Sequence, residues 1–254
     1  MSLRIERIPT LGDNYTYLLV CGVTQQAAIV DAPEEAPVVA AVDRSGARVT
    51  KVLSTHHHPD HSMANPALAA RYGVPVIGHV SDADRLPGFT DGVDEGDVVA
   101  VGEQRARVLH IPCHTRGHVA YVFDDAKAVL SGDMLFAAGC GRFFEGTAAE
   151  MFDALVGKLA RLPDDMGVFC GHEYTLTNLR FAASVEPDNA AVARKLARVE
   201  AIRAKAAPDW HDATPAEMTI PSTIGEEKAT NPFMRAADAE ELGRLRALKD
   251  QFAG

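Results

Sequence analysis

The chain has 254 residues and a formal net charge of −10 at neutral pH, with 47% hydrophobic and 24% charged residues. This size predicts one large domain or one domain with a smaller companion, and the composition is that of a globular protein. The acidic balance argues against proteins that bind nucleic acid or anionic membranes, because both classes need a basic surface. No apolar run approaches the roughly 20 residues of a membrane span, and the N-terminal residues lack a signal segment, so we expect a cytoplasmic protein.

The cysteines also indicate a cytoplasmic protein. The four cysteines form no C-x-x-C pair, which argues against a zinc ribbon or a thioredoxin-like site. We expect them to be small buried residues in a reducing compartment: Cys21, Cys113, Cys140 and Cys170.

The first two thirds of the chain alternate strands with short helices. Runs rich in β-branched and aromatic residues predict strands at 15–21, 27–31, 49–54, 74–77, 97–101, 105–111, 119–123, 128–131 and 168–170. Apolar residues at helical spacing predict helices at 37–45, 65–72 and 148–162. We therefore expect a mixed α/β domain over residues 1–172.

The last third has a different character and contains no clear strand pattern. Apolar residues at helical spacing predict helices at 175–185, 189–206 and 238–252. The segment 208–230 contains three prolines, and we expect it to be a long surface connection. The prediction is an α+β protein whose residues 173–254 form a small C-terminal helical domain.

One short motif carries the strongest chemical signal. Thr55-His-His-His-Pro-Asp-His61 follows a predicted strand, so its side chains sit at a strand end. His56 and His58 are two residues apart and point the same way in an extended segment, whereas His57 points the opposite way and is not expected to bind metal. The Asp60–His61 pair lies past the turn at Pro59 and can face a second metal.

Three further ligand-type residues also follow predicted strands. They are His114, Asp133 and His172. With the motif they divide into two sets around a bridging carboxylate: His56, His58 and His114 for one ion, Asp60, His61 and His172 for the other, and Asp133 between them. This arrangement leaves room for a shared water, as an open catalytic site requires. His118, four residues after His114, either orients a ligand or is an ordinary buried histidine.

We expect two divalent metal ions per chain. All the candidate ligands donate nitrogen or oxygen, which suits zinc best and also allows iron or manganese.

At this point the motif and the residues His114, Asp133 and His172 resemble the metallo-β-lactamase superfamily. The resemblance implies an αββα sandwich with a metal pair at one edge. A narrower resemblance, to the glyoxalase II (hydroxyacylglutathione hydrolase) family, covers essentially the whole chain. It is carried by the segments Gly139–Thr147, Gly171–Thr175, Asn231–Arg235 and Arg246–Phe252. It implies hydrolysis of S-(2-hydroxyacyl)glutathione thioesters, chiefly S-D-lactoylglutathione to D-lactate and glutathione.

The implied chemistry is attack by a metal-bridged hydroxide on the thioester carbonyl. A thiolate leaves without the protonation that an amine needs, since thiol pKa values lie near 8.5, and no general acid is required. We predict Asp60, His61 and Asp133 as the catalytic residues within the ligand set.

Glutathione thioesters are net anionic, so an acidic protein needs a local basic patch to bind them. Arg246 and Lys249 are three residues apart on the last predicted helix and share a face. By helix pattern alone this pair is typical of a solvated face, but the resemblance places it on the glycine carboxylate of glutathione. Arg142, Phe144 and Tyr174 also match substrate-contact positions. Arg142 stands where the family often has Lys, and Phe144 replaces a frequent Tyr, which removes a phenolic hydrogen bond.

Other functions are compatible with the same residues. The alternatives are a glutathione persulfide dioxygenase, which would use one iron, another hydrolase of the metallo-β-lactamase fold, and a non-catalytic binding protein that retains the site. The complete ligand set and the helical C-terminal part favour the thioesterase. We expect a monomer that binds a small-molecule substrate and neither nucleic acid nor membrane.

Overall fold

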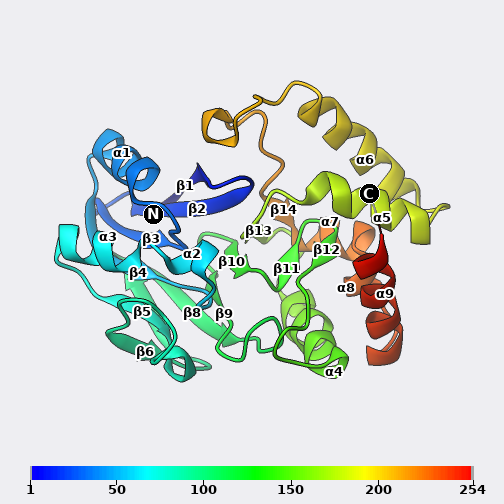
Figure 1. Ribbon diagram of the computed structural model, residues 1–254, viewed down its shortest axis with the longest axis horizontal. Coiled ribbons are helices and arrows are strands. Elements are labelled where there is room, and N and C mark those ends of the chain that lie inside the picture. The colour runs from blue at the N-terminus through cyan, green and yellow to red at the C-terminus, as the bar shows by residue number, and fades with distance from the viewer. Residues whose placement is uncertain (1, 253–254) are drawn as a thin grey trace.

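Two six-stranded sheets face each other in a computed structural model that describes residues 2–252 (Figure 1). The first sheet has the order β1-β2-β3-β4-β5-β6, antiparallel up to β3 and parallel from β3 onward. Its strands are β1 (Leu3–Thr10), β2 (Asn14–Cys21), β3 (Gln26–Val30), β4 (Arg48–Leu53), β5 (Val76–His79) and β6 (Asp91–Val93). The helices of this half are α1 (Glu35–Ser45), α2 (Pro59–Ser62) and α3 (Asn65–Tyr72).

The second sheet has the order β14-β13-β10-β9-β8-β7, with β10 and β13 parallel and the other pairs antiparallel. Its strands are β7 (Val98–Val101), β8 (Gln104–His110), β9 (Val119–Phe123), β10 (Ala128–Gly132), β13 (Gly167–Cys170) and β14 (Ser222–Thr223). A separate small hairpin pairs β11 (Leu135–Phe136) with β12 (Gly139–Cys140). α4 (Ala148–Phe152) continues through a π-helical segment, Asp153–Lys158, and a 3-10 turn, Leu159–Arg161.

The C-terminal part is mainly helical and lies beside the second sheet, at the right of Figure 1. Its helices are α5 (Thr175–Val185), α6 (Ala190–Arg203), α7 (Ile224–Thr230), α8 (Pro232–Arg235) and α9 (Ala239–Gln251), with a 3-10 turn at Trp210–Asp212. No helix within residues 2–252 combines the length and the apolar character that crossing a bilayer requires.

Both sheets are covered on both faces, which explains their nearly continuous apolar strands. In β2 the neighbours Leu18 and Leu19 are fully buried on opposite sides: Leu18 packs with α1 and α3, and Leu19 lies between the sheets. The outer face of the second sheet shares one core with α4 and the C-terminal helices, including Val122, Phe181 and Phe233. The expected α+β fold, an αββα sandwich followed by helices, is confirmed.

The structure corrects several expected elements. β1 and β6 were not predicted; β1 is a partly exposed edge strand whose charged residues obscure the apolar pattern. The prediction of 208–230 as a plain connection, with no strand after residue 173, is wrong. β14 pairs with β13 there, and Thr223 caps α7 by accepting a hydrogen bond from the Glu226 amide. The helix expected at 148–162 is α-helical only over its first five residues, Ala148–Phe152.

The inter-sheet core gives a test of this architecture. Leu130→Ala, a truncation of a side chain that is 1% exposed between the sheets, is expected to lower the free energy of unfolding by about 2–5 kcal/mol. Val98→Ala, at a half-exposed position of β7, is the control and should change it by less than about 1 kcal/mol. Urea denaturation measures both, and equal losses would contradict the placement of Leu130.

Candidate metal centre

All the predicted metal ligands meet at one edge of the sandwich, beyond the ends of four strands. The histidine motif follows β4, His114 lies in the loop after β8, Asp133 follows β10 and His172 follows β13. Pro59 begins the short helix α2, which turns Asp60 and His61 back toward the same edge.

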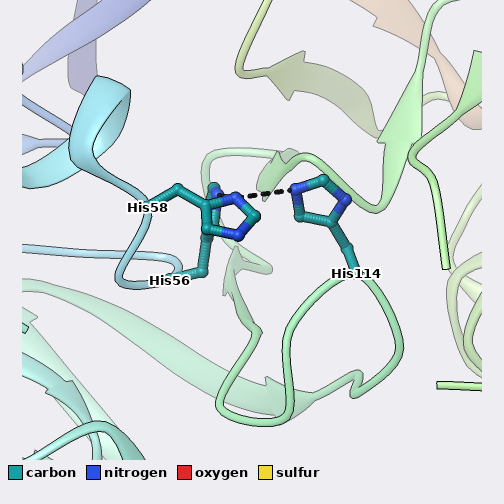
Figure 2. A group of neighbouring side chains, drawn as sticks. All are labelled: His56, His58 and His114. Atoms are coloured by element: carbon teal, nitrogen blue, oxygen red, sulfur yellow. Dashed lines mark hydrogen bonds between the residues drawn. The ribbon is translucent and has the colours of Figure 1, made fainter. Parts of the chain in front are cut away.

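The first group of candidate ligands consists of His56, His58 and His114 (Figure 2). His56 Nε2 and His114 Nε2 each lie 3.1 Å from His58 Nδ1. Their rings are nearly perpendicular, at 79° for His56 and 77° for His114 relative to His58. Ligands of a tetrahedral ion with 2.0–2.1 Å bonds are separated by about 3.3 Å, so the three nitrogens have the spacing of a shared ion.

The second group consists of Asp60, His61 and His172. His61 Nε2 lies 3.2 Å from His172 Nε2, and Asp60 Oδ2 lies 3.5 Å from His172 Nε2. Asp133 stands between the groups: one carboxylate oxygen is 3.4 Å from His61 Nε2, and the other is 3.5 Å from His114 Nε2. The buried Oδ1 of Asp133 has no hydrogen-bond partner among residues 2–252, as expected of an oxygen that binds a metal. The donor set therefore fits divalent metal ions.

Three of the candidate histidine ligands, His172, His114 and His61, have an orienting partner behind them. His172 Nδ1 lies 2.7 Å from Asp13 Oδ1, and His114 Nδ1 donates to the carbonyl of Arg142 at 3.1 Å. Such partners fix the tautomer of a ligating imidazole and direct its other nitrogen to the metal. Asp31 accepts hydrogen bonds from Thr55 and lies 3.4 Å from His61 Nδ1.

Sequence reasoning missed Asp13 and Asp31. Asp31 directly follows β3, which is the same strand-end signal that singled out Asp133, so the pattern contained the evidence for it. Asp13 lies in the turn between β1 and β2, where an aspartate usually only shapes the backbone.

The two remaining histidines of this region have different roles. His57 turns away from the ligand groups, and its Nδ1 lies 3.3 Å from Asp82 Oδ2, in agreement with its predicted exclusion. His118 is fully buried, stacks on His56 at 4.8 Å and accepts a hydrogen bond from the Asp133 amide at 3.0 Å. Of the two interpretations left open, the orienting one agrees with these contacts.

A further histidine group, His79, Asp94 and His110, lies outside this edge. The His79 and His110 rings stack in parallel, with centroids 4.1 Å apart and 15° between the planes. Parallel rings cannot aim both lone pairs at one ion, unlike the perpendicular rings of the first group. The His110 Nε2–H group instead donates to the Arg116 carbonyl at 2.8 Å. This group is a packed pair rather than a ligand set.

The protonation states of the ligand groups differ. Burial, with the neighbouring His114 and His57, lowers the pKa of His58 to about 4, so this imidazole is neutral at pH 7. Burial also lowers the pKa of His61, but Asp133 and Asp31 outweigh it and raise the pKa to about 10. For His172 the Asp133 and Asp13 carboxylates likewise outweigh burial and raise the pKa far above its usual range. Without metal, these two histidines are protonated and compensate the carboxylates.

The metal edge opens into a pocket of about 710 Å³ that both parts of the chain line. Every predicted substrate contact borders it: Arg142, Phe144, Tyr174, Arg246 and Lys249. Tyr174 stacks on His172 at 4.5 Å, and the exposed Phe144 ring lies 5.1 Å from His114. A volume of this size suits a small organic ligand.

The arginine side chains of the pocket are held by hydrogen bonds and ion pairs, unlike side chains on a solvated helix face. Arg246 is only 7% exposed and donates to the Cys140 carbonyl at 2.9 Å, so the solvated-face interpretation is wrong for this residue. Its Nη2 is 2.9 Å from Asp250 Oδ1, which also lies 3.3 Å from Arg142 Nε. Asp250 was missed from the sequence, where it reads as an ordinary charged residue near a helix end.

Comparisons with known proteins agree with this geometry. The sequence profile of the metallo-beta-lactamase superfamily matches residues 10–172, and the chain belongs to that superfamily. The profile named hydroxyacylglutathione hydrolase C-terminus matches residues 173–252. The hydroxyacylglutathione hydrolase of Rhodospirillum rubrum is 44% identical over 94% of this chain and 89% of its own length. That of Acidiphilium cryptum is 45% identical over 98% and 96%. The chain is therefore a member of the hydroxyacylglutathione hydrolase family, and it is an enzyme of the hydrolase class, as expected.

Solved structures show the same fold. ETHE1 from Myxococcus xanthus superposes with a TM-score of 0.71 at 27% identity, covering 97% of this chain and 90% of its own. The BLEG-1 B3 metallo-beta-lactamase gives a TM-score of 0.67 at 21% identity, over 92% and 100%, which supports the fold alone.

The position of Asp133 between the ligand groups gives a direct test. Asp133→Ala is expected to lower the metal content by at least one ion per chain and to reduce turnover at least 100-fold, because both groups lose a shared ligand. Elemental analysis of the purified variant measures the content. His57→Ala is the control, and unchanged metal content in Asp133→Ala would contradict the assignment.

The raised pKa values predict a proton release. At pH 7 the metal-free chain holds protons on His61 and His172, which metal binding must displace, so loading is expected to release at least two protons and to tighten as pH rises. Calorimetric titration of the metal-free chain with zinc, in buffers of different ionisation enthalpy, counts these protons. A count of zero would contradict protonated imidazoles at this site.

Proposed function

We propose that the protein hydrolyses S-(2-hydroxyacyl)glutathione thioesters, chiefly S-D-lactoylglutathione to D-lactate and glutathione. The observation that carries the proposal is the shared pocket, in which a His/Asp metal edge faces three basic side chains, Arg142, Arg246 and Lys249. Membership of the hydroxyacylglutathione hydrolase family supports the same reaction.

We further propose two divalent ions, zinc first, with iron and manganese also compatible with nitrogen and oxygen donors. His56, His58 and His114 would hold one ion and Asp60, His61 and His172 the other, with Asp133 shared. When bound, such ions supply hydroxide at neutral pH and polarise the carbonyl of the substrate. The side chain of Asp60 is 44% exposed, and we propose that it orients the attacking water.

The leaving group needs little help from the chain. A thiol has a pKa near 8.5, so glutathione can depart as the thiolate without a general acid. Burial raises the pKa of Tyr174 to about 12, which keeps its hydroxyl protonated and able to donate a hydrogen bond in the pocket. Phe144 has no such hydroxyl and offers an apolar surface beside the first ligand group.

We propose that the anionic end of the substrate binds beside Arg246 and Lys249. The buried Nε of Arg246 lacks a hydrogen-bond partner within the described chain, which leaves a donor that a carboxylate can satisfy. Burial and the neighbouring Arg246 lower the pKa of Lys249 to about 8, and an incoming carboxylate would favour its charged form. Asp250 bridges Arg142 and Arg246 and can pair with the ammonium group of glutathione.

The alternative of a glutathione persulfide dioxygenase gains no support from the comparisons. The curated relatives at 41–46% identity are hydroxyacylglutathione hydrolases, and the C-terminal profile has the same name.

We also propose that the chain divides into two domains, residues 1–172 and 173–254. We propose that it is a monomer with a cytoplasmic location. Four free, buried cysteines support a reducing compartment.

The reaction is tested by incubating protein of measured metal content with S-D-lactoylglutathione and following thiol release. We expect fast turnover that a chelator abolishes and added zinc restores. Absence of turnover with two ions bound would overturn the proposal, and oxygen uptake with glutathione persulfide by the iron-loaded protein would support the alternative.

The substrate end of the pocket is tested separately. Lys249→Ala is expected to raise KM for S-D-lactoylglutathione about tenfold and to change kcat less than about threefold, because uniform binding is lost. Arg244→Ala, at an exposed position of the same helix, is the matched control. Steady-state kinetics measure both variants, and an unchanged KM in Lys249→Ala would remove this residue from the binding site.

A further inference from the structure

The hairpin β11–β12 connects two parts of the metal edge. It starts two residues after Asp133, and two residues after its end stands Arg142, whose carbonyl accepts the hydrogen bond from His114 Nδ1. Phe136, on its first strand, packs against His172 at 5.9 Å. A shift of this hairpin would therefore disturb ligands of both groups.

The turn of the hairpin is held by buried side chains of the C-terminal helices. Glu227 Oε2 accepts from the Ala138 amide at 2.6 Å. The Asn231 amide nitrogen donates to the carbonyls of Phe136 at 3.2 Å and Gly139 at 2.9 Å, and also lies 3.0 Å from Glu227 Oε2. Glu227 and Asn231 are both fully buried.

The turn needs this support because Ala138 has a left-handed backbone, with φ of 56°. Residues with a Cβ atom disfavour this region, and they remain there only when the surroundings impose it. The neighbouring Gly139 is also constrained, since a Cβ atom there would lie 2.5 Å from Asn178 Nδ2.

A buried ion pair fixes Glu227 in turn. Lys195 Nζ, from α6, lies 2.8 Å from Glu227 Oε1, and Lys195 is only 5% exposed. Ser222 hydrogen-bonds the same carboxylate oxygen. A buried ion pair is weak evidence for stability in itself, but it can specify one arrangement of the groups around it.

We propose that Lys195, Glu227 and Asn231, the turn-holding cluster, are positioning residues for the metal edge. The cluster imposes the left-handed turn at Ala138 and thereby fixes Asp133 at one end of the hairpin and the Arg142 carbonyl at the other. The helical part of the chain thus orients the metal ligands as well as lining the substrate pocket. The kinetic part of this inference rests on the proposed thioesterase function.

The chain offers a matched pair of asparagines for the test. Asn231 and Asn189 both cap a helix, α8 and α6, and both donate to a backbone carbonyl, but only Asn231 reaches the hairpin. Serine is a good N-cap residue, so Asn231→Ser and Asn189→Ser keep the caps and shorten the donors.

For Asn231→Ser we expect zinc release to a chromogenic chelator to become about tenfold faster than in the wild type. We also expect kcat on S-D-lactoylglutathione to fall about tenfold with KM changed less than threefold. Asn189→Ser should match the wild type in both measurements. If Asn231→Ser does not fold, Glu227→Gln, which keeps an acceptor oxygen, should show the same direction of change.

A rescue experiment separates positioning from general stability. Glycine accepts a left-handed backbone freely, so Ala138→Gly in the Asn231→Ser background should restore at least half of the lost kcat and slow zinc release. Wild-type behaviour of Asn231→Ser, equal defects in Asn189→Ser, or no rescue by Ala138→Gly would each overturn the inference. An inactive wild type would overturn the thioesterase instead, and the zinc-release comparison would still test the cluster.

Discussion

The site depends on the burial of one carboxylate, that of Asp133, among imidazoles from three separate loops. An unpaired charge in such a place would be strongly unfavourable, so the surroundings must supply positive charge from protonated histidines or from metal ions. His61, His114 and His172 all approach this carboxylate within 3.5 Å. The three histidines follow different strands. The negative charge of Asp133 is therefore compensated only when these strand ends come together in the fold, and without that compensation burial of Asp133 would oppose their convergence.

The sandwich provides the rigidity that such convergence needs. The candidate ligands lie past buried strands, and His61, His114 and His172 are oriented from behind by groups from other parts of the fold, such as Asp13 for His172. The backbone at this edge is as constrained as the side chains. A Cβ atom on Gly141 would lie 2.0 Å from the Asp133 carbonyl oxygen, so only glycine fits between the hairpin and the ligand loop. A small displacement of the backbone at this edge would move several candidate metal ligands at once.

Sequence alone predicted the parts of the site that local pattern encodes. His56 and His58 were placed on one face by the two-residue period of extended chain, and His57 was excluded by the same argument. The hairpin turn could not be predicted, because its left-handed residue is Ala138 rather than a glycine or asparagine. The burial of Arg246 and the bridging role of Asp250 depend on how α9 packs against Cys140 and Arg142, which no local pattern contains. α7 did have a local signal, because Thr223 and Glu226 have the spacing of a helix N-cap, whereas the pairing of Ser222 with the distant Val168 had none.

The two walls of the pocket come from different parts of the chain. The metal wall belongs to the sandwich, whereas Arg246 and Lys249 lie on α9, near the C-terminal end. This separation means that recognition of the thiol portion can diversify at α9 positions that do not contact the hairpin, such as Lys249, while the metal ligands stay unchanged. Members of this fold act on unlike substrates. In such a layout, natural or engineered substitutions in the substrate-binding helix can change specificity while the metal centre stays the same.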